Sequence, residues 1–180
     1  MNDIEKIIDV YLDALVCDKQ NKLPLPIVPA MADAKQDIEE EWRIWYPIKS
    51  AVTDKELKRF ESSIGCTLPE SYKQFLKYKH FYELQIGACS FCEHPAGVWE
   101  TSLSAMIFDE SSKEQVFDKG KIPFATWEDW ALLCFDTTAK NDREEYAIVL
   151  WDPEACDCFE FVYDSFEDMM ISLHEEQTEQ

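Results

Sequence analysis

Glycine and histidine are scarce in this chain, and their scarcity removes several common classes of active site. The four glycines lie far apart among 180 residues, so no glycine-rich loop is available to cradle a phosphate. No Gly-x-Ser-x-Gly or His-Glu-x-x-His motif is present, and none of the three histidines has a recognisable nucleophile or base beside it. Acidic pairs such as Glu128-Asp129 suit cation binding or proton transfer, but in a chain with 37 acids they arise by chance. We therefore expect a binding protein without catalysis; a zinc- or cation-dependent enzyme is an alternative.

Long apolar runs are also absent. No stretch of about 18 apolar residues occurs, and the first residues lack the basic and apolar segments of a secretory signal. The seven cysteines are odd in number and irregularly spaced, which is typical of reduced thiols. Because 46% of the residues are apolar, the chain can bury a substantial core. We expect a cytoplasmic protein with one main domain.

Basic residues are few and unevenly placed. The chain has 17 lysines and arginines against 37 acids, for a net charge of −20. Residues 1–48 carry 10 acids and 5 bases, and residues 49–87 carry 5 acids and 7 bases. Residues 88–180 carry 22 acids and 5 bases, a net charge of −17. Such a field repels nucleic acid and anionic membranes and attracts basic partners, although solubility alone is a sufficient explanation from composition.

Apolar periodicity and turn residues predict the N-terminal elements. Isoleucines and leucines at helical spacing predict an amphipathic helix over 3–16. The proline-rich stretch 22–29 cannot be helical throughout and is interpreted as a semi-extended connector. A second helix is predicted over 31–45. Residues 1–48 are therefore expected to form a helical extension.

The stretch from Thr53 to Leu76 predicts two short helices joined by a tight corner. Thr53 and Glu56 have the spacing of a capping box, and Val52 and Leu57 that of a hydrophobic staple. Gly65 ends the first helix and Pro69 begins the second. The apolar faces of both helices point to core positions: Leu57, Phe60, Ile64, Leu68, Tyr72, Phe75 and Leu76.

Short β-branched and aromatic runs predict the second half. A helix is predicted over 98–108 and a final helix over about 165–174, with Ser165 as its N-cap. Residues 137–145 are interpreted as a polar hairpin loop, and 175–180 as a frayed tail. The predicted strands begin at 82–86 and continue at 122–127, 132–136, 146–151 and 158–163. Clustered strands with helices at one end indicate an α+β fold with a mainly antiparallel sheet.

The corner carries a family resemblance. Its Gly65-x-x-Leu-Pro-x-x-Tyr-x-x-Phe-Leu76 pattern resembles the N-terminal signature of the SUKH superfamily, which includes the yeast cell-wall-assembly regulator and bacterial toxin-immunity proteins. The resemblance continues in Ile122-Pro-Phe-Ala, Trp127–Asp136, Ala147–Asp152 and Val162–Met169. It implies a single SUKH-like domain over 49–174, with helices packed at one face of the sheet and the extension 1–48 in front of it.

Cysteines offer one metal hypothesis. Cys89-x-x-Cys92-x-His94 has chelate spacing, and Cys156-x-Cys158 would add two thiolates to complete a zinc shell. Cys-x-Cys is an unusual zinc partner, and cysteine is often simply buried. We favour ordinary cysteines and expect no cofactor.

The resemblance implies an immunity protein that neutralises a cognate toxin, in our reading a nuclease, by covering its basic cleft. A non-catalytic regulatory scaffold is the alternative. Tryptophans beside carboxylates suit a basic partner through charge pairing and cation–π contact, although for Trp130 a core position is favoured. The predicted partner-binding residues are Trp127, Glu128, Asp129, Asp136, Asp152 and Asp164.

Overall fold

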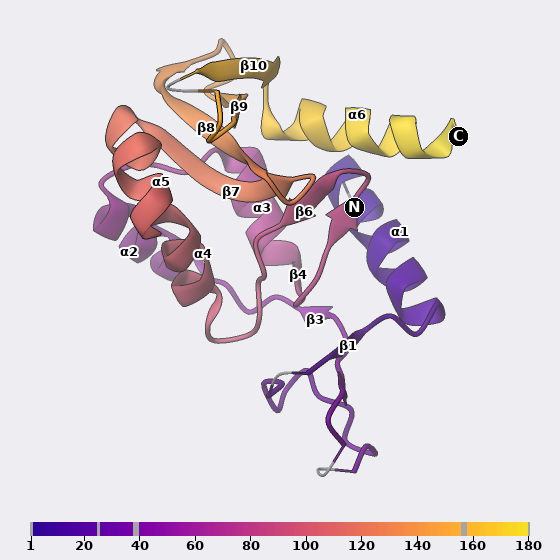
Figure 1. The fold of residues 1–180 in the computed structure, drawn as a ribbon. Helices are drawn as coiled ribbons and strands as arrows, with labels where there is room; N and C mark the ends of the chain where they lie inside the picture. The colour runs from indigo at the N-terminus through magenta and orange to yellow at the C-terminus, as the bar shows by residue number, and fades with distance from the viewer. Residues whose placement is uncertain (1, 25, 38–39, 156–157, 180) are drawn as a thin grey trace.

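The computed structural model describes residues 2–24, 26–37, 40–155 and 158–179. Its centre is a six-stranded sheet in the order β10-β9-β8-β7-β6-β5, in which all neighbours are antiparallel (Figure 1). The strands are β5 (Gln85–Ile86), β6 (Cys89–Phe91), β7 (Lys121–Trp127), β8 (Ala131–Lys140), β9 (Tyr146–Trp151) and β10 (Phe159–Tyr163). Two small sheets pair β1 (Lys22–Leu23) with β2 (Arg43–Ile44) and β3 (Ile48–Lys49) with β4 (Lys79–His80).

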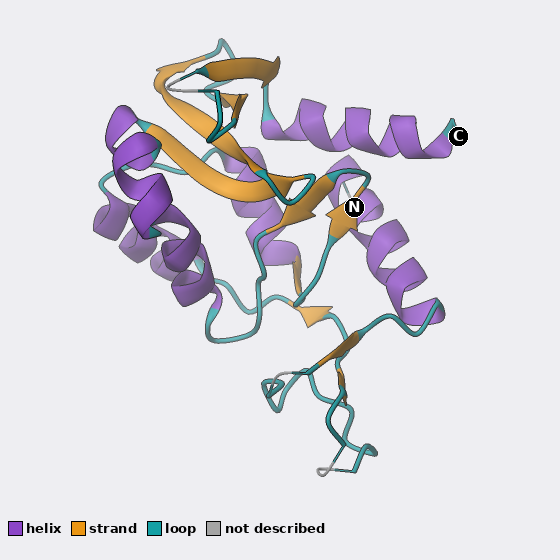
Figure 2. Cartoon of the chain, viewed as in Figure 1, coloured by secondary structure: helices purple, strands orange, loops and turns teal. Residues whose placement is uncertain are grey.

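Helices surround this sheet (Figure 2). They are α1 (Asp3–Cys17), α2 (Asp54–Ile64), α3 (Glu70–Tyr78), α4 (Trp99–Ile107), α5 (Glu110–Gln115), the 3-10 turn η1 (Phe117–Lys119) and α6 (Phe166–Thr178). Helix α6 packs on α1 and α3 and reaches from β9 and β10 to β5. The predicted α+β class with a mainly antiparallel sheet is confirmed.

The corner between α2 and α3 forms as its sequence predicts. The Thr53–Glu56 capping box is present, and Gly65 ends α2 with a φ of 69° in the left-handed region, which glycine adopts without steric cost. Pro69 is the N-cap of α3 and has no side chain that can cap. Glu145 supplies the cap instead, because its carboxylate accepts hydrogen bonds from the Ser71 backbone nitrogen at 3.0 Å and the Ser71 hydroxyl at 2.7 Å. The corner is therefore fixed to the sheet.

The main core lies between the sheet and helices α1, α3 and α6. Tyr72 of α3 contacts four phenylalanine rings, and Phe166 at the start of α6 contacts three of the same rings. Because side chains alternate along strands, β8 and β9 also present residues to the opposite face. There Val116, which precedes η1, completes a second, smaller cluster with Cys134, Val149 and Trp151. The sheet therefore has apolar residues buried on both faces.

The predicted helix over 31–45 is wrong. This segment doubles back, so that Ala32 forms an isolated antiparallel bridge with Trp45. The Gln36 side chain accepts a hydrogen bond from the Ile44 backbone at 2.6 Å, and Asp33 accepts one from Lys35 at 2.9 Å. Such side-chain bonds compete with helical backbone bonds. The described part of 20–47 forms an arm that protrudes from the body (Figures 1 and 2).

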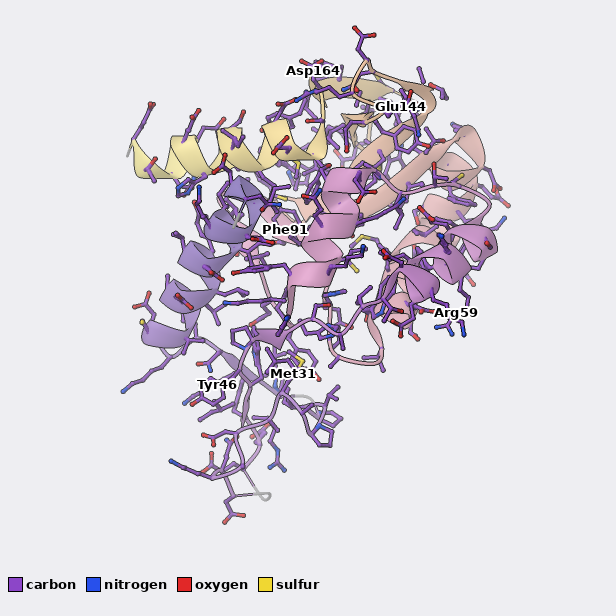
Figure 3. All side chains as sticks on the ribbon, turned by 180° about the vertical axis from the view of Figure 1, so that it is seen from behind. Met31, Tyr46, Arg59, Phe91, Glu144 and Asp164 are labelled. Atoms are coloured by element: carbon purple, nitrogen blue, oxygen red, sulfur yellow. The ribbon has the colours of Figure 1, made fainter. Side chains whose placement is uncertain are left out.

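Buried aromatic residues anchor the arm to the body. The Trp45 ring packs edge-on against Tyr82 at 5.7 Å, and the Tyr82 hydroxyl accepts a hydrogen bond from the Val28 backbone at 2.7 Å. Met31 is buried beside them, whereas Tyr46 is exposed; Figure 3 labels both in the arm. The proline-rich stretch contains no helix among its described residues, as predicted, while Leu25 lies outside them. Among its described residues, the N-terminal extension therefore contains one helix, α1, rather than two.

Other boundaries differ by a few residues. β8 runs to Lys140, so the loop before β9 is shorter than the predicted 137–145. Helix α6 continues to Thr178, past the predicted end at His174. The Gln177 side chain there lies against Gly87, where the added Cβ of any other residue would come within 2.8 Å of its amide nitrogen. The helix over 98–108 is confirmed as α4.

Candidate interaction surface

The six predicted partner-binding residues fall into separate places rather than one patch. Glu128 and Asp129 form the β7–β8 turn, and Asp152 follows the end of β9 beside it, because Leu132 pairs with Trp151. Asp136 lies in the middle of β8, paired with Lys121 at the start of β7, five residues from Ala131, or about 17 Å along the strand. Asp164 lies beside the loop between β8 and β9, near Glu144 (Figure 3). Only the first group adjoins an exposed tryptophan.

The β7–β8 turn is held in an uncommon backbone conformation. Glu128 and Asp129 have φ values of 48° and 62°, in the left-handed region that favours glycine. The Trp130 backbone donates to the Trp127 carbonyl at 3.2 Å, and the Glu128 backbone donates to the Ala88 carbonyl at 2.9 Å. The turn is thereby fixed to the neighbouring β5–β6 turn and presents two carboxylates at the end of the sheet.

Beside this turn lies a groove of about 510 Å³ between α4, α5 and the ends of β8 and β9. Trp151 is buried at its base, while Trp130 is 48% exposed and donates from its indole to the Glu128 carboxylate at 3.3 Å. The expected core position for Trp130 is therefore wrong. The residues that line the groove are Ala105, Met106, Asp109, Ser112, Gln115, Trp130, Leu132, Trp151 and Pro153. The groove combines an apolar base with one lining carboxylate, Asp109, and adjoins the acidic β7–β8 turn.

Trp127 points to the opposite face from this groove. It packs against the main core and lines a smaller cavity of about 220 Å³. The other residues of that cavity are Leu133, Leu150, Glu160, Val162 and Tyr163. Trp127 and Trp130 therefore do not act on one surface, although they are three residues apart.

Asp136 already has internal partners. It accepts hydrogen bonds from Lys121 at 2.9 Å and from the Thr138 backbone and hydroxyl at 3.0 and 2.6 Å. Partial burial opposes ionisation of this carboxyl, but these donors outweigh it and hold its pKa below the usual value. The Asp164 carbonyl accepts a hydrogen bond from the Asn141 amide at 3.0 Å. The Asp136 carboxylate is therefore used within the fold, whereas Asp164 is exposed and only its backbone carbonyl has this bond.

Of the residues in the zinc hypothesis, Cys89 and His94 are buried, Cys92 is partly buried and Cys158 is exposed. Cys89 is fully buried in β6, and burial raises the pKa of its thiol far above the usual value. His94 donates from Nε2 to the Leu76 carbonyl at 2.8 Å. Among the described residues, no three His, Cys, Asp or Glu side chains converge as metal ligands. Cys156 lies outside those residues.

A buried histidine pair was missed by sequence reasoning. The rings of His80 and His94 are 4.8 Å apart, and both side chains are buried. The Ala51 backbone donates to His80 Nε2 at 3.1 Å, so the proton is on Nδ1, which donates to the His94 carbonyl at 3.1 Å. Burial lowers the pKa of both imidazoles, that of His94 to about 3. Both are therefore neutral and structural at pH 7.

Residues 51–172 match the SMI1 / KNR4 family (SUKH-1), which covers more than half of the chain. The chain belongs to this family. No curated protein matches it closely enough to report. The SUKH-1 match begins just before the α2–α3 corner and ends within α6, so the arm lies outside it.

The SUKH-1 signature residues are structural. Leu68, Tyr72, Phe75 and Leu76 are all buried in the main core, as expected. The groove and the exposed Trp130 lie on the acidic part of the SUKH-1 domain instead. Within the described part of the chain, no helix has the length and apolar character needed to cross a membrane.

Proposed function

We propose that this SUKH-1 protein is an immunity protein, which binds a cognate bacterial toxin with a basic surface and covers its active or substrate-binding cleft without catalysis. One observation carries the proposal. The groove beside the β7–β8 turn holds an exposed indole that donates to the Glu128 carboxylate, with Asp129 in the same turn and Asp152 after the neighbouring strand end, in a chain with a net charge of −20. Exposed tryptophan at the centre of a contact is a common source of binding energy, and a rim of one charge speeds association with an opposite surface.

A nuclease suits this chemistry best among toxin classes. The cleft of a nuclease is basic because it binds phosphates, and the acidic half of this chain would compete for the same residues. Residues 88–180 hold 22 of the 37 acids. The inhibitor must also associate before the toxin acts, which favours electrostatic steering.

The test is to mix the protein with the toxin domain encoded beside its gene and measure binding by calorimetry at low and high salt. We expect a one-to-one complex, weaker at high salt, and loss of toxin activity at one equivalent. Trp130→Ala should weaken binding by about 2 kcal/mol. Trp42→Ala is the matched control, because Trp42 is 53% exposed but lies on the arm. A complete lack of complex, or equal binding by both variants, would contradict the proposal.

Family membership alone also accommodates a regulatory scaffold, which would bind several partners and inhibit none. The gene neighbourhood separates the two roles. A large toxin gene directly upstream supports immunity, whereas an isolated housekeeping locus supports the scaffold.

A further inference from the structure

One edge of the central sheet is open. β10 has five residues and pairs with β9 on one side, and no described residue pairs with its other side (Figure 1). The opposite edge strand, β5, has only two residues, and α6 contacts both edge strands. An unpaired edge presents backbone donors and acceptors that can accept another strand.

The side chains of β10 favour such pairing. Phe161 is 58% exposed, the largest exposed fraction among the described large hydrophobic side chains. By strand alternation it lies on the same face as Phe159, which packs against the second apolar cluster and pairs in register with Trp151. Glu160 points to the other face and lines the cavity beside Trp127. An added strand would therefore meet an apolar side chain on one face and a carboxylate on the other.

The charge around β10 selects the occupant. Residues 144–180 contain 12 acids and no lysine or arginine. A nearby cation, Lys121, has its ammonium 5.2 Å from the Phe159 ring centre and already pairs with Asp136. A second copy of the chain would bring another acidic β10 segment to the edge, and like charges directly opposite one another destabilise strand pairing. The favoured occupant is consequently a basic strand.

We propose that β10 accepts an extended segment of a partner protein as a seventh strand of the sheet, and that lysines or arginines alternate with apolar residues in that segment. The backbone of β10 provides the hydrogen bonds, Phe161 contacts the apolar side chains, and Glu160 pairs with the basic ones. This inference does not depend on toxin inhibition, because any partner with such a segment can pair with the free backbone donors and acceptors of β10.

The test uses a synthetic eight-residue peptide of alternating lysine and valine with blocked ends. Its counterpart, N-methylated at every second residue, keeps the charge but cannot form one side of a strand ladder. We expect the first peptide to slow amide hydrogen exchange in β10, and the N-methylated peptide to bind roughly tenfold more weakly or worse. This comparison leaves the protein unchanged, so its outcome does not depend on the folding of a variant.

Two variants complete the design. Glu160→Lys should weaken binding of the unmodified peptide by roughly tenfold. Asp13→Lys is the control, since Asp13 is exposed on α1 and the change in charge is the same; it should leave binding within about twofold, because exposed charges elsewhere are screened. Equal binding of both peptides, protection confined to the Trp130 groove, or a β10 already protected in a dimer of the free protein would each overturn the inference. A toxin complex that forms while β10 stays unprotected by the peptide would refute this inference alone.

Discussion

Glu145 caps helix α3 through Ser71, a residue 74 positions earlier in the chain. Both side chains are buried, and the α3 N-cap, Pro69, provides no side-chain acceptor of its own. The hydrogen bonds therefore connect the family signature to the loop before β9. Their removal leaves a buried donor at a helix start, where a negative charge is most favourable.

Glu145→Gln should lower the free energy of unfolding by about 1–2 kcal/mol, because a neutral amide replaces the charged acceptor of two buried donors. Urea unfolding followed by circular dichroism measures the change. Glu144→Gln is the matched control next to it: its side chain is 82% exposed and pairs only with Lys140 among the ion pairs of the described residues. Equal effects of the two substitutions would show that Glu145 is not a cap.

Acid should destabilise the protein before its carboxylates titrate. Burial lowers the pKa of His80 and His94 below 6.5, so the unfolded state binds more protons than the folded state once the pH falls below about 6.5. Stability is therefore complete above pH 6.5 and declines at up to ~1.4 kcal/mol per pH unit for each histidine. For His94 the decline continues to about pH 3.

The carboxyl contribution can be separated from this decline. Salt-bridged Asp9, Asp136 and Asp168 have lowered pKa values, so their loss of stability belongs below about pH 3.8. His94→Gln keeps an amide donor for the Leu76 carbonyl but removes one titration. Its stability should depend less steeply on pH between 6.5 and 4 than that of the unaltered protein. An unchanged slope would rule out His94 as the titrating group.

The β7–β8 turn should become more stable with glycine. Asp129 has a φ of 62°, and Asp129→Gly removes the steric cost of that conformation, for a gain of about 0.5–1 kcal/mol. Asp142→Gly is the control and should change stability in the opposite direction, because Asp142 is an exposed loop residue whose own φ is not positive. There the added freedom of the unfolded chain should cost about 0.5 kcal/mol. Thermal unfolding distinguishes the two signs.

The contact between Gln177 and Gly87 should couple the end of α6 to the β5–β6 turn. Gly87→Ala combines a φ of 57° with an approach of 2.8 Å to the Gln177 amide, whereas Gly65→Ala has a similar φ and nothing within 4 Å. We expect Gly65→Ala to cost about 1 kcal/mol and Gly87→Ala to cost more. Gln177→Ala should recover the difference at Gly87 and have no effect at Gly65. If it does not, the end of α6 is not packed against this turn.

The sequence predicted those elements whose ends and faces are determined by residues close to one another in the chain. The capping box at Thr53, the glycine at 65 and the N-cap at Ser165 each determine a helix end through contacts within four residues. Strands β7 to β10 were predicted for the same reason, since alternation and turn residues are local patterns. The helix predicted over 31–45 was wrong because the conformation of the arm also depends on Trp45 packing against Tyr82, 37 positions later. No local pattern encodes that contact.

The candidate surface was only partly predictable. The sequence showed that Glu128, Asp129 and Asp152 are each close to a tryptophan in the chain. It did not show that Trp127 and Trp130 lie on opposite faces of the sheet. Asp136 looked equally acidic in sequence, yet Lys121 from the neighbouring strand satisfies it. The exposure of Phe161 follows from the position of β10 at the edge, which a strand pattern alone does not reveal.

Phe166 gives the fold a late closing step during synthesis. Its ring contacts Tyr72, Phe75, Phe91, Phe124 and Phe135, so it lies against aromatic side chains from both the helical corner and the sheet. In a nascent chain that has left the ribosome only as far as β10, these aromatic side chains would be exposed to solvent because Phe166 is not yet packed on them. Such a chain is a substrate for chaperones, and a premature stop before α6 should yield aggregated or degraded protein rather than a weaker version of the native one.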